Sequence, residues 1–360
     1  MKKHIQRLSE QSRRLIVAQL EQLRSKTATP MNGTPKVTNQ NLAAHREEVL
    51  GSARKLIYPL DAPRHRIIKL SAAIGAAAII GFLIFCLLAL YRFQSSSVFV
   101  YGVTQVVPFP VAIIDNRHFV SYNDYLFELR HTLHYLESQQ HVNFSNNKEH
   151  ARLSAARQNA LDQVVQQAFV DRLASQHHLS VSEADIDTAI ARLRSQNRLG
   201  ASEQVFESVL SEFWGWSVAD FRRELKNELL AQKVVAVLDT QTASRAQSAL
   251  TQLQQGKDFA VLAHDASDDL ATKASGGAYA ALIDRTTTQL PPQAIDTLFS
   301  LQPSHYSGIV NTGYALEIFK VNDVQGSQLH AAHIQFNFTP ISTYTSKQAS
   351  ASKTVRLITP

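Results

Sequence analysis

Hydrophobic positions follow three different patterns along this 360-residue chain. From Leu70 to Tyr91 it runs 22 residues without a charged side chain. At about 1.5 Å per residue such a helix is about 33 Å long, which matches the roughly 30 Å hydrocarbon core of a bilayer. A helix also satisfies its own backbone hydrogen bonds there. The pattern predicts a transmembrane helix over 70–91, and a buried core helix is the alternative.

From residue 121 to 238, apolar residues recur every three to four positions, the spacing of amphipathic helices. Two helix starts are marked by a serine followed three residues later by an acidic residue, which is the capping-box pattern. These pairs are Ser180 with Glu183 and Ser217 with Asp220. A mostly α-helical module is therefore predicted over 111–238, preceded by a linker over 92–110.

After residue 238 the pattern changes to short helices and strands. Apolar segments predict strands at 307–310, 314–321 and 329–338. A few antiparallel strands among helices indicate a small α+β domain over 239–338, followed by a C-terminal tail over 339–360. The predicted fold class is α+β, with one N-terminal transmembrane helix and a mostly α-helical module.

Charge divides the chain at the apolar segment. Residues 1–69 hold 14 Lys and Arg against 5 Asp and Glu, a net charge of +9, and the rest holds 22 against 25, a net charge of −3. Because basic flanks stay on the cytoplasmic side, 1–69 is predicted to be a cytoplasmic tail and 70–91 an uncleaved signal-anchor. The protein is then a single-pass cell-membrane protein with its C-terminal domain outside. The tail carries no recognised binding motif, so no nucleic-acid partner is expected.

The single cysteine, Cys86, lies inside the predicted span. It excludes an intramolecular disulfide and any multi-cysteine metal site. An extracytoplasmic domain without disulfides indicates a bacterial source. His131 and His134 are spaced as a helical pair but have no evident third ligand, so neither a metal nor a cofactor is expected.

Residues 246–280 read AQSALTQLQQGKDFAVLAHDASDDLATKASGGAYA, which resembles the parvulin (PpiC-type) peptidyl-prolyl isomerase domain. That family has a helix, G-x-D-F, Ala, S-x-D and G-G in this order. Residues 290–321 resemble its apolar-pocket loop, helix and final Gly-Tyr strand. The helical module resembles the chaperone module of SurA/PrsA-type foldases, so the resemblance covers roughly 110–338.

One segment departs from the family's order. Parvulin domains begin with a strand carrying A-x-H-I, and here LHAAHIQFNF at 329–338 has this character but follows the last strand. Two hypotheses stay open: the segment begins a second, truncated domain, or it folds back beside 314–321 in a circularly permuted domain. We favour the second because the loop over 324–328 is short enough for a hairpin.

The resemblance implies which residues form the site. It places His333 at the first-strand histidine and Asp269 where the family has Cys or Asp, both as catalytic residues. Four positions are implied to bind substrate: Leu290, Phe299, Ala294 and Ala315. The last two depart from the family, which has a pocket Phe and a strand His there. A buried strand histidine at His333 and a helix N-cap at Asp269 are the alternatives.

The resemblance implies a membrane-anchored extracytoplasmic foldase. Its partners would be unfolded secreted or envelope polypeptides, and it would isomerise X–Pro bonds as a parvulin-class enzyme. Such isomerisation breaks no bond, so the lack of a Ser-His-Asp arrangement is no objection. The alternative is a non-catalytic chaperone or envelope interaction protein on a degenerate parvulin fold. The sequence leaves the clients and the oligomeric state, a homo-oligomer included, open.

Overall fold

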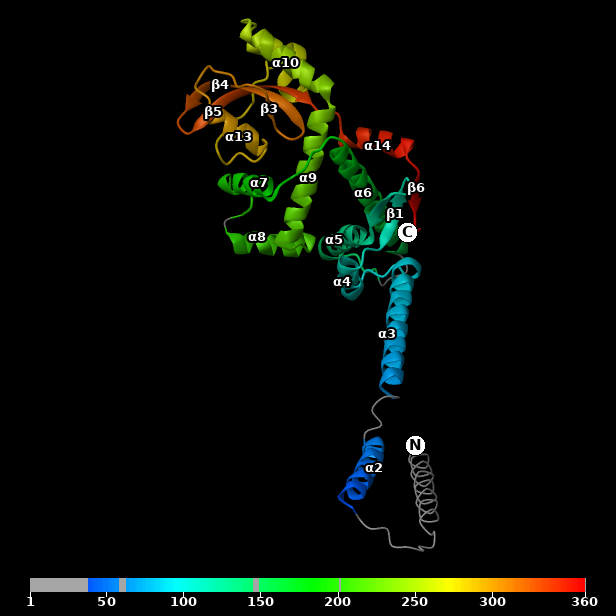
Figure 1. The fold of residues 1–360 in the computed structure, drawn as a ribbon. Coiled ribbons are helices and arrows are strands. Elements are labelled where there is room, and N and C mark those ends of the chain that lie inside the picture. Colours follow the sequence, from blue (N-terminus) through cyan, green and yellow to red (C-terminus); the bar gives the residue numbers. More distant parts are fainter. Residues whose placement is uncertain (1–37, 58–62, 145–148, 201, 360) are drawn as a thin grey trace. The chain divides into compact units, whose positions relative to one another are not determined.

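The computed structural model describes residues 38–57, 63–144, 149–200 and 202–359 (Figure 1). Contacts divide the chain into two compact units, Met1–Phe82 and Leu83–Pro360. In the first unit, helix α2 spans Asn39–Ile57. The first 37 residues of the predicted basic tail lie outside the described residues.

The uncharged segment forms helix α3 (Pro63–Leu87), which continues as a π-helical turn, η1 (Leu88–Arg92). The helix predicted over 70–91 is thus confirmed. Within the described part of the chain, Ile68–Arg92 is the one segment long and apolar enough to cross a membrane. Length and composition alone carry that assignment.

The linker predicted over 92–110 is wrong, because this segment is folded. It contains helix α4 (Val98–Val106), and Val100 and Phe109 are buried in the hydrophobic core that also holds Leu90. The segment has apolar residues at helical spacing and no charge beyond its first residue, so packing it against a core removes apolar surface from water.

The helical module begins with a hairpin of β1 (Pro110–Ile114) and β2 (His118–Ser121), whose turn places Asp115 and Asn116 at positive φ. Asp and Asn adopt this conformation more readily than most residues. The predicted helices follow: α5 (Tyr122–Gln140), α6 (His150–Gln176), α7 (Glu183–Ser195), α8 (Glu203–Val209) with the π-helical turn η3 (Leu210–Trp214), and α9 (Val218–Leu238).

One of the two predicted capping boxes is displaced. The box that begins at Ser217 is present at the start of α9, but α7 is capped by Ser182 rather than Ser180. Ser180 with Glu183 and Ser182 with Asp185 both fit the capping-box spacing, and the apolar residues that flank Ser182 select the second pair. Val181 and Ile186 are both buried, at the positions of a hydrophobic staple around a cap at Ser182.

Residues 339–360 were predicted to be a tail, but the structure folds them into helix α14 (Ile341–Ala351) and strand β6 (Thr354–Arg356). Strand β6 pairs antiparallel with β1, so the first sheet has the order β2-β1-β6. The Asp115 carboxylate accepts a hydrogen bond from the Lys353 backbone N–H, 238 residues later. A three-residue strand has too few apolar positions to give a sequence pattern.

The α+β domain consists of α10 (Thr240–Gln254), α11 (Phe259–Ala266), α12 (Leu270–Lys273), α13 (Pro292–Leu298), β3 (Val310–Asn311), β4 (Ala315–Gln325) and β5 (Gln328–Asn337). Its sheet has the order β3-β4-β5 (Figure 1). Because side chains alternate along a strand, Ile318 packs with α10 and α11, whereas Phe319 packs with α13 on the other face.

Strand β5 forms the hairpin expected for residues 329–338. It pairs with β4 along its length, with Phe319 opposite His333, and Gly326 supplies a positive φ in the tight turn. The segment therefore completes the same domain and does not begin a second one. A circularly permuted order relative to the parvulin family stays a prediction.

Candidate functional site

His333 lies in the middle of β5 and is 3% exposed. It is opposite Phe319, and strand alternation places Glu317 on the same face, one diagonal step away. Long side chains reach each other across such diagonals. As a result, the Nδ1 atom of His333 lies 2.7 Å from Oε2 of Glu317.

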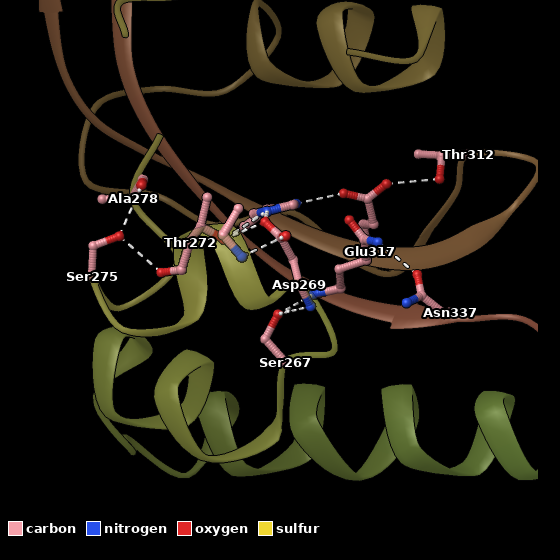
Figure 2. A network of polar contacts seen from close by, with 11 residues as sticks. Ser267, Asp269, Thr272, Ser275, Ala278, Thr312, Glu317 and Asn337 are labelled. Carbon is pink, nitrogen blue, oxygen red and sulfur yellow. Dashed lines mark hydrogen bonds and ion pairs between the residues drawn. The ribbon is translucent and has the colours of Figure 1, made fainter. Parts of the chain in front are cut away.

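The other ring nitrogen faces the start of α12. Nε2 of His333 lies 2.9 Å from Oδ2 of Asp269 and 3.0 Å from Oγ1 of Thr272 (Figure 2). An imidazole donates from both nitrogens only in its protonated form. Each ring nitrogen here faces one carboxylate, Asp269 on one side and Glu317 on the other, an arrangement that suits a ring donating from both nitrogens. We call these three residues with Thr272 and Thr312 the His333 network.

Asp269 caps α12 and also contacts His333. The same side chain is therefore both a helix N-cap and a neighbour of the histidine, the two alternatives that the sequence left open. Its carboxylate accepts the Ala271 N–H at 3.1 Å and the Thr272 hydroxyl at 2.6 Å. Burial raises the pKa of the Asp269 carboxyl, but hydrogen bonds from Thr272 and His333 outweigh it and lower the pKa below its usual value. The side chain is 22% exposed, against 5% for Glu317.

Glu317 is a site residue that no sequence motif indicated. Its Oε1 atom accepts the Thr312 hydroxyl at 2.8 Å, so both carboxylate oxygens have partners (Figure 2). Strand periodicity was the available signal: Glu317 follows Ala315 by two residues and therefore shares its face. A buried carboxylate is costly unless it is paired and hydrogen-bonded, and His333 with Thr312 meets that need.

Two aromatic rings pack against the imidazole. The ring centroid of Tyr279 lies 4.5 Å from that of His333, and Phe319 is nearly parallel at 6.3 Å. The Tyr279 hydroxyl is buried and has no hydrogen-bond partner among the described residues. Burial, with the nearby charge of Glu317, raises the pKa of Tyr279, so the hydroxyl keeps its proton.

Gly277 brings the segment that carries Tyr279 close to β5. The His333 backbone N–H donates to the Gly277 carbonyl at 2.9 Å. Gly277 has φ +82°, and a Cβ atom there would lie 2.1 Å from the His333 carbonyl oxygen. Both the conformation and the close approach require glycine.

The four residues predicted to bind substrate differ in how exposed they are to solvent. Ala294 and Ala315 are buried, at 0% and 4% exposed, and pack inside the domain. Leu290 and Phe299 are half-buried beside the core between α13 and β4. The structure thus joins His333 to Asp269 and leaves Leu290 and Phe299 as the partly accessible apolar pair.

The helical module holds the loop that carries Leu290. The Arg198 guanidinium donates to the Leu290 carbonyl, and the buried Gln196 side chain donates to the carbonyl of the first residue of α13 at 2.8 Å. Arg192 forms an ion pair with Asp296 of α13 at 2.9 Å. The end of α7 therefore fixes the position of the predicted substrate loop.

A second candidate site is an apolar surface on α8 and η3, which we call the α8 face. It comprises Val205, Val209, Phe213 and Trp214, which are 43–47% exposed. The first three are spaced four residues apart, which places helical residues on one side. Trp214 stacks on Tyr135 of α5 with ring centroids 5.4 Å apart. This surface offers aromatic area without sequence-specific polar contacts.

His131 and His134 hold η3 against α5. Nδ1 of His131 lies 3.0 Å from the Trp214 carbonyl oxygen, and Nε2 of His134 lies 3.0 Å from that of Glu212. Each nitrogen donates to a carbonyl near a helix end, where such oxygens lack intrahelical partners. No group of three or more potential metal ligands occurs in the part of the chain that the structure describes.

A cleft of about 390 Å³ lies in the helical module and is lined by Glu128 of α5 and Glu224 of α9. Burial, with the nearby charge of Glu224, raises the pKa of Glu128 to about 7. Burial also raises the pKa of Glu224. The charge of Arg223 lowers both pKa values, and a hydrogen bond from Asn227 lowers that of Glu224, but burial outweighs them.

Two family comparisons match these regions. A model of the PPIC-type PPIASE domain matches residues 231–323, and a model of the SurA-like N-terminal domain matches residues 67–235. The first match ends before β5, so the strand that carries His333 lies beyond it.

A curated relative is the chaperone SurA of Methylobacillus flagellatus, which is 25% identical over 236 residues. The match covers 50% of this chain, and the chain spans 52% of that relative's length. Among solved structures, the foldase protein PrsA from Streptococcus pneumoniae shows 20% identity over 55% of this chain and 74% of its own. The TM-score of this match is 0.19.

The two matched domains occur in the order in which the sequence predicted them, the helical module first and the α+β domain second. With a match to the SurA-like N-terminal domain followed by a match to the PPIC-type PPIASE domain, the chain is similar to the SurA/PrsA-type foldases.

Proposed function

We propose that this chain is a membrane-anchored extracytoplasmic foldase whose α+β domain catalyses isomerisation of X–Pro bonds. The observation that carries this proposal is the contact between His333 and Asp269. These residues are 64 positions apart in sequence, their side chains lie 2.9 Å apart, and the resemblance implies a catalytic role for both. The PPIC-type match over the preceding residues supports it.

The chemistry needs no nucleophile. The X–Pro amide resists rotation because of its partial double-bond character, with a barrier of about 18–20 kcal/mol. Twisting removes this resonance and makes the amide less polar. A site that is apolar around the bond and carries a few fixed charges lowers the barrier by favouring the twisted form.

Different residues supply the apolar surface and the fixed charge. Leu290 and Phe299 supply partly exposed apolar surface for the proline ring. Asp269 is the most accessible carboxylate of the His333 network and presents a fixed negative charge to the substrate. His333 and Glu317 lie behind Asp269 and act as positioning residues, because their contacts hold its carboxylate in place and ionised.

The test is a protease-coupled assay on a proline tetrapeptide with the full chain in detergent. Asp269→Asn keeps an N-cap residue on α12 but removes the charge. We expect kcat/KM to fall about tenfold or more, equivalent to about 1.4 kcal/mol of transition-state stabilisation. The matched control is Asp268→Asn, because the adjacent carboxylate pairs with Arg245 instead, and it should retain activity. Full activity in Asp269→Asn would remove Asp269 from the mechanism.

A second candidate function, a non-catalytic chaperone on this fold, is favoured by the burial of the site. His333 is 3% exposed, and Ala294, at the family's pocket-Phe position, is fully buried. A full-length protein that leaves the isomerisation rate at its uncatalysed value, yet suppresses aggregation of an unfolded client, would establish this function instead.

Client binding is assigned to the α8 face. Unfolded polypeptides expose apolar side chains in no fixed order. Phe213 and Trp214 offer exposed aromatic surface that can contact such side chains. The double variant Phe213→Ser, Trp214→Ala should lower aggregation suppression while isomerase activity on a tetrapeptide stays unchanged. Val324→Ser, at a 48% exposed site on β4, is the matched control. Equal suppression by both variants would exclude the α8 face.

The membrane assignment rests on Ile68–Arg92 and on the excess of basic residues before it. Resistance of the full chain to alkaline extraction from membranes would support the anchor. Protease added outside intact cells should digest the α+β domain and leave a tag at the N-terminus protected. A protected α+β domain would contradict the proposed orientation.

A further inference from the structure

Helix α4 exposes an unusual amount of apolar surface for a helix outside the span. Phe93, Val98, Phe99 and Val106 are 59–83% exposed, whereas Val100 and Thr104 face the core. Arg92 is the one charged residue between Leu70 and Ile114. A surface helix in water normally turns polar residues outward, whereas most of the outward side chains of α4 are apolar.

The position of α4 indicates what covers this surface. The ring of Phe99 contacts that of Phe85, with centroids 6.4 Å apart. Phe85 lies seven residues before Arg92 in the candidate span, which is about 10 Å along a helix axis. A bilayer that surrounds the end of the span, with Arg92 at its surface, therefore also reaches Phe99.

The attachment of α4 is fixed. The Tyr122 hydroxyl donates to the Leu90 carbonyl at 2.6 Å, and that of Tyr91 donates to the Pro110 carbonyl at 2.5 Å. The Arg130 guanidinium donates to the Ser96 carbonyl at 2.6 Å. The end of the span, the 93–97 loop and α4 thus belong to one packed body.

We infer that α4 lies in the outer interface of the same bilayer, with Phe93, Val98, Phe99 and Val106 in lipid. This inference rests on the proposed membrane anchor and deepens it. The Arg130 guanidinium lies 5.2 Å from the centroid of the Tyr101 ring, so a cation and an aromatic ring occur together on this part of the molecule, as they do at headgroup level. The helical module is then held against the membrane instead of swinging on a linker.

The test uses the full chain in vesicles of phosphatidylcholine and phosphatidylglycerol. On a Cys86→Ala background, single cysteines replace Ile79, Phe99, Val106 or Val324, each labelled with an environment-sensitive fluorophore. Doxyl groups on the acyl chains quench probes in lipid, and iodide quenches probes in water. We expect positions 79, 99 and 106 to lose emission with doxyl lipid and to resist iodide, and position 324 to do the reverse.

The outcomes separate this inference from the anchor. Lipid quenching at 79 with iodide quenching at 99 and 106 would keep the anchor and overturn the α4 assignment. Iodide quenching at 79 and 99 would overturn both. Resistance of 99 and 106 to both quenchers would also overturn the assignment, because a protein surface, such as a second copy of the chain, would then cover α4. Positions 99 and 106 lie at opposite ends of α4, so one misfolded variant does not decide the result.

Discussion

The helical module and the α+β domain treat carboxylates in opposite ways. Around His333, Asp269 and Glu317 are hydrogen-bonded on opposite sides of one ring, and the pKa of Asp269 is lowered. In the cleft of the helical module, burial raises the pKa values of Glu128 and Glu224. The difference shows that the direction of a carboxyl group's pKa shift depends on the partners around it as well as on its burial.

The largest effect is expected from removing the shared partner. His333→Ala leaves the buried Glu317 carboxyl without the imidazole that it contacts, which should destabilise the α+β domain by about 3–5 kcal/mol. Hydrogen exchange of the β4 and β5 amides measures this domain alone. His330→Ala is the matched control, because that histidine is half-exposed on the same strand, and it should change stability by less than about 0.5 kcal/mol. Similar protection in both variants would contradict a charged network.

The next effect has the opposite sign and lies in the helical module. The pKa of Glu128 is raised from 4.5 to about 7, so ionising it opposes folding above pH 7 and has no such cost below pH 4.5. Glu128→Gln should therefore stabilise the module by about 1–3 kcal/mol at pH 8 and by nothing at pH 4. Urea unfolding followed by Trp fluorescence measures it. Glu137→Gln, at an exposed site on the same helix, should leave stability unchanged at both pH values.

Asp269→Asn gives a smaller effect with the reverse pH dependence. Because the folded pKa is lowered, the charge of Asp269 stabilises the fold above the unfolded pKa of 3.8, and this contribution is lost as pH falls through the folded value. The variant should cost about 1–2 kcal/mol at pH 7, a loss that shrinks below pH 3.8. A pH-independent loss would contradict a contribution from the charge of Asp269.

The smallest effect is expected at the contact between the two regions. Arg192 and Asp296 are 35% and 49% exposed, so their ion pair is screened by water. Arg192→Ala should cost about 0–1 kcal/mol and slightly speed exchange in the loop around residue 290. A loss above about 2 kcal/mol would show that α7 carries the α+β domain's stability.

Strong periodic signals predicted the fold well. The uncharged run predicted α3, the Ser217 pattern predicted the start of α9, and the two-residue turn with Gly326 fits the hairpin of β4 and β5. Each of these signals is local in sequence. Where two local signals overlapped, as at Ser180 and Ser182, the burial of the flanking residues Val181 and Ile186 decided between them.

Non-local features were not predictable in this way. The resemblance placed His333 and Asp269 in one site, but only the register of β4 against β5 brings Glu317 to the same ring. Strand β6 is recognised only by its pairing with β1, since three residues carry no pattern of their own. The polar run at 94–97 favours a linker, whereas α4 is recognised by the packing of Val100 against the core.

The pairing of β6 with β1 also sets the order in which the module is completed during synthesis. Asp115, at the end of β1, and Lys353, at the start of β6, are 238 residues apart. At about 5–20 residues per second, the edge of β1 waits about 12–48 s for its partner. An unpaired strand edge is a template for aggregation. During its own translation this chain therefore meets the hazard from which it is proposed to protect others.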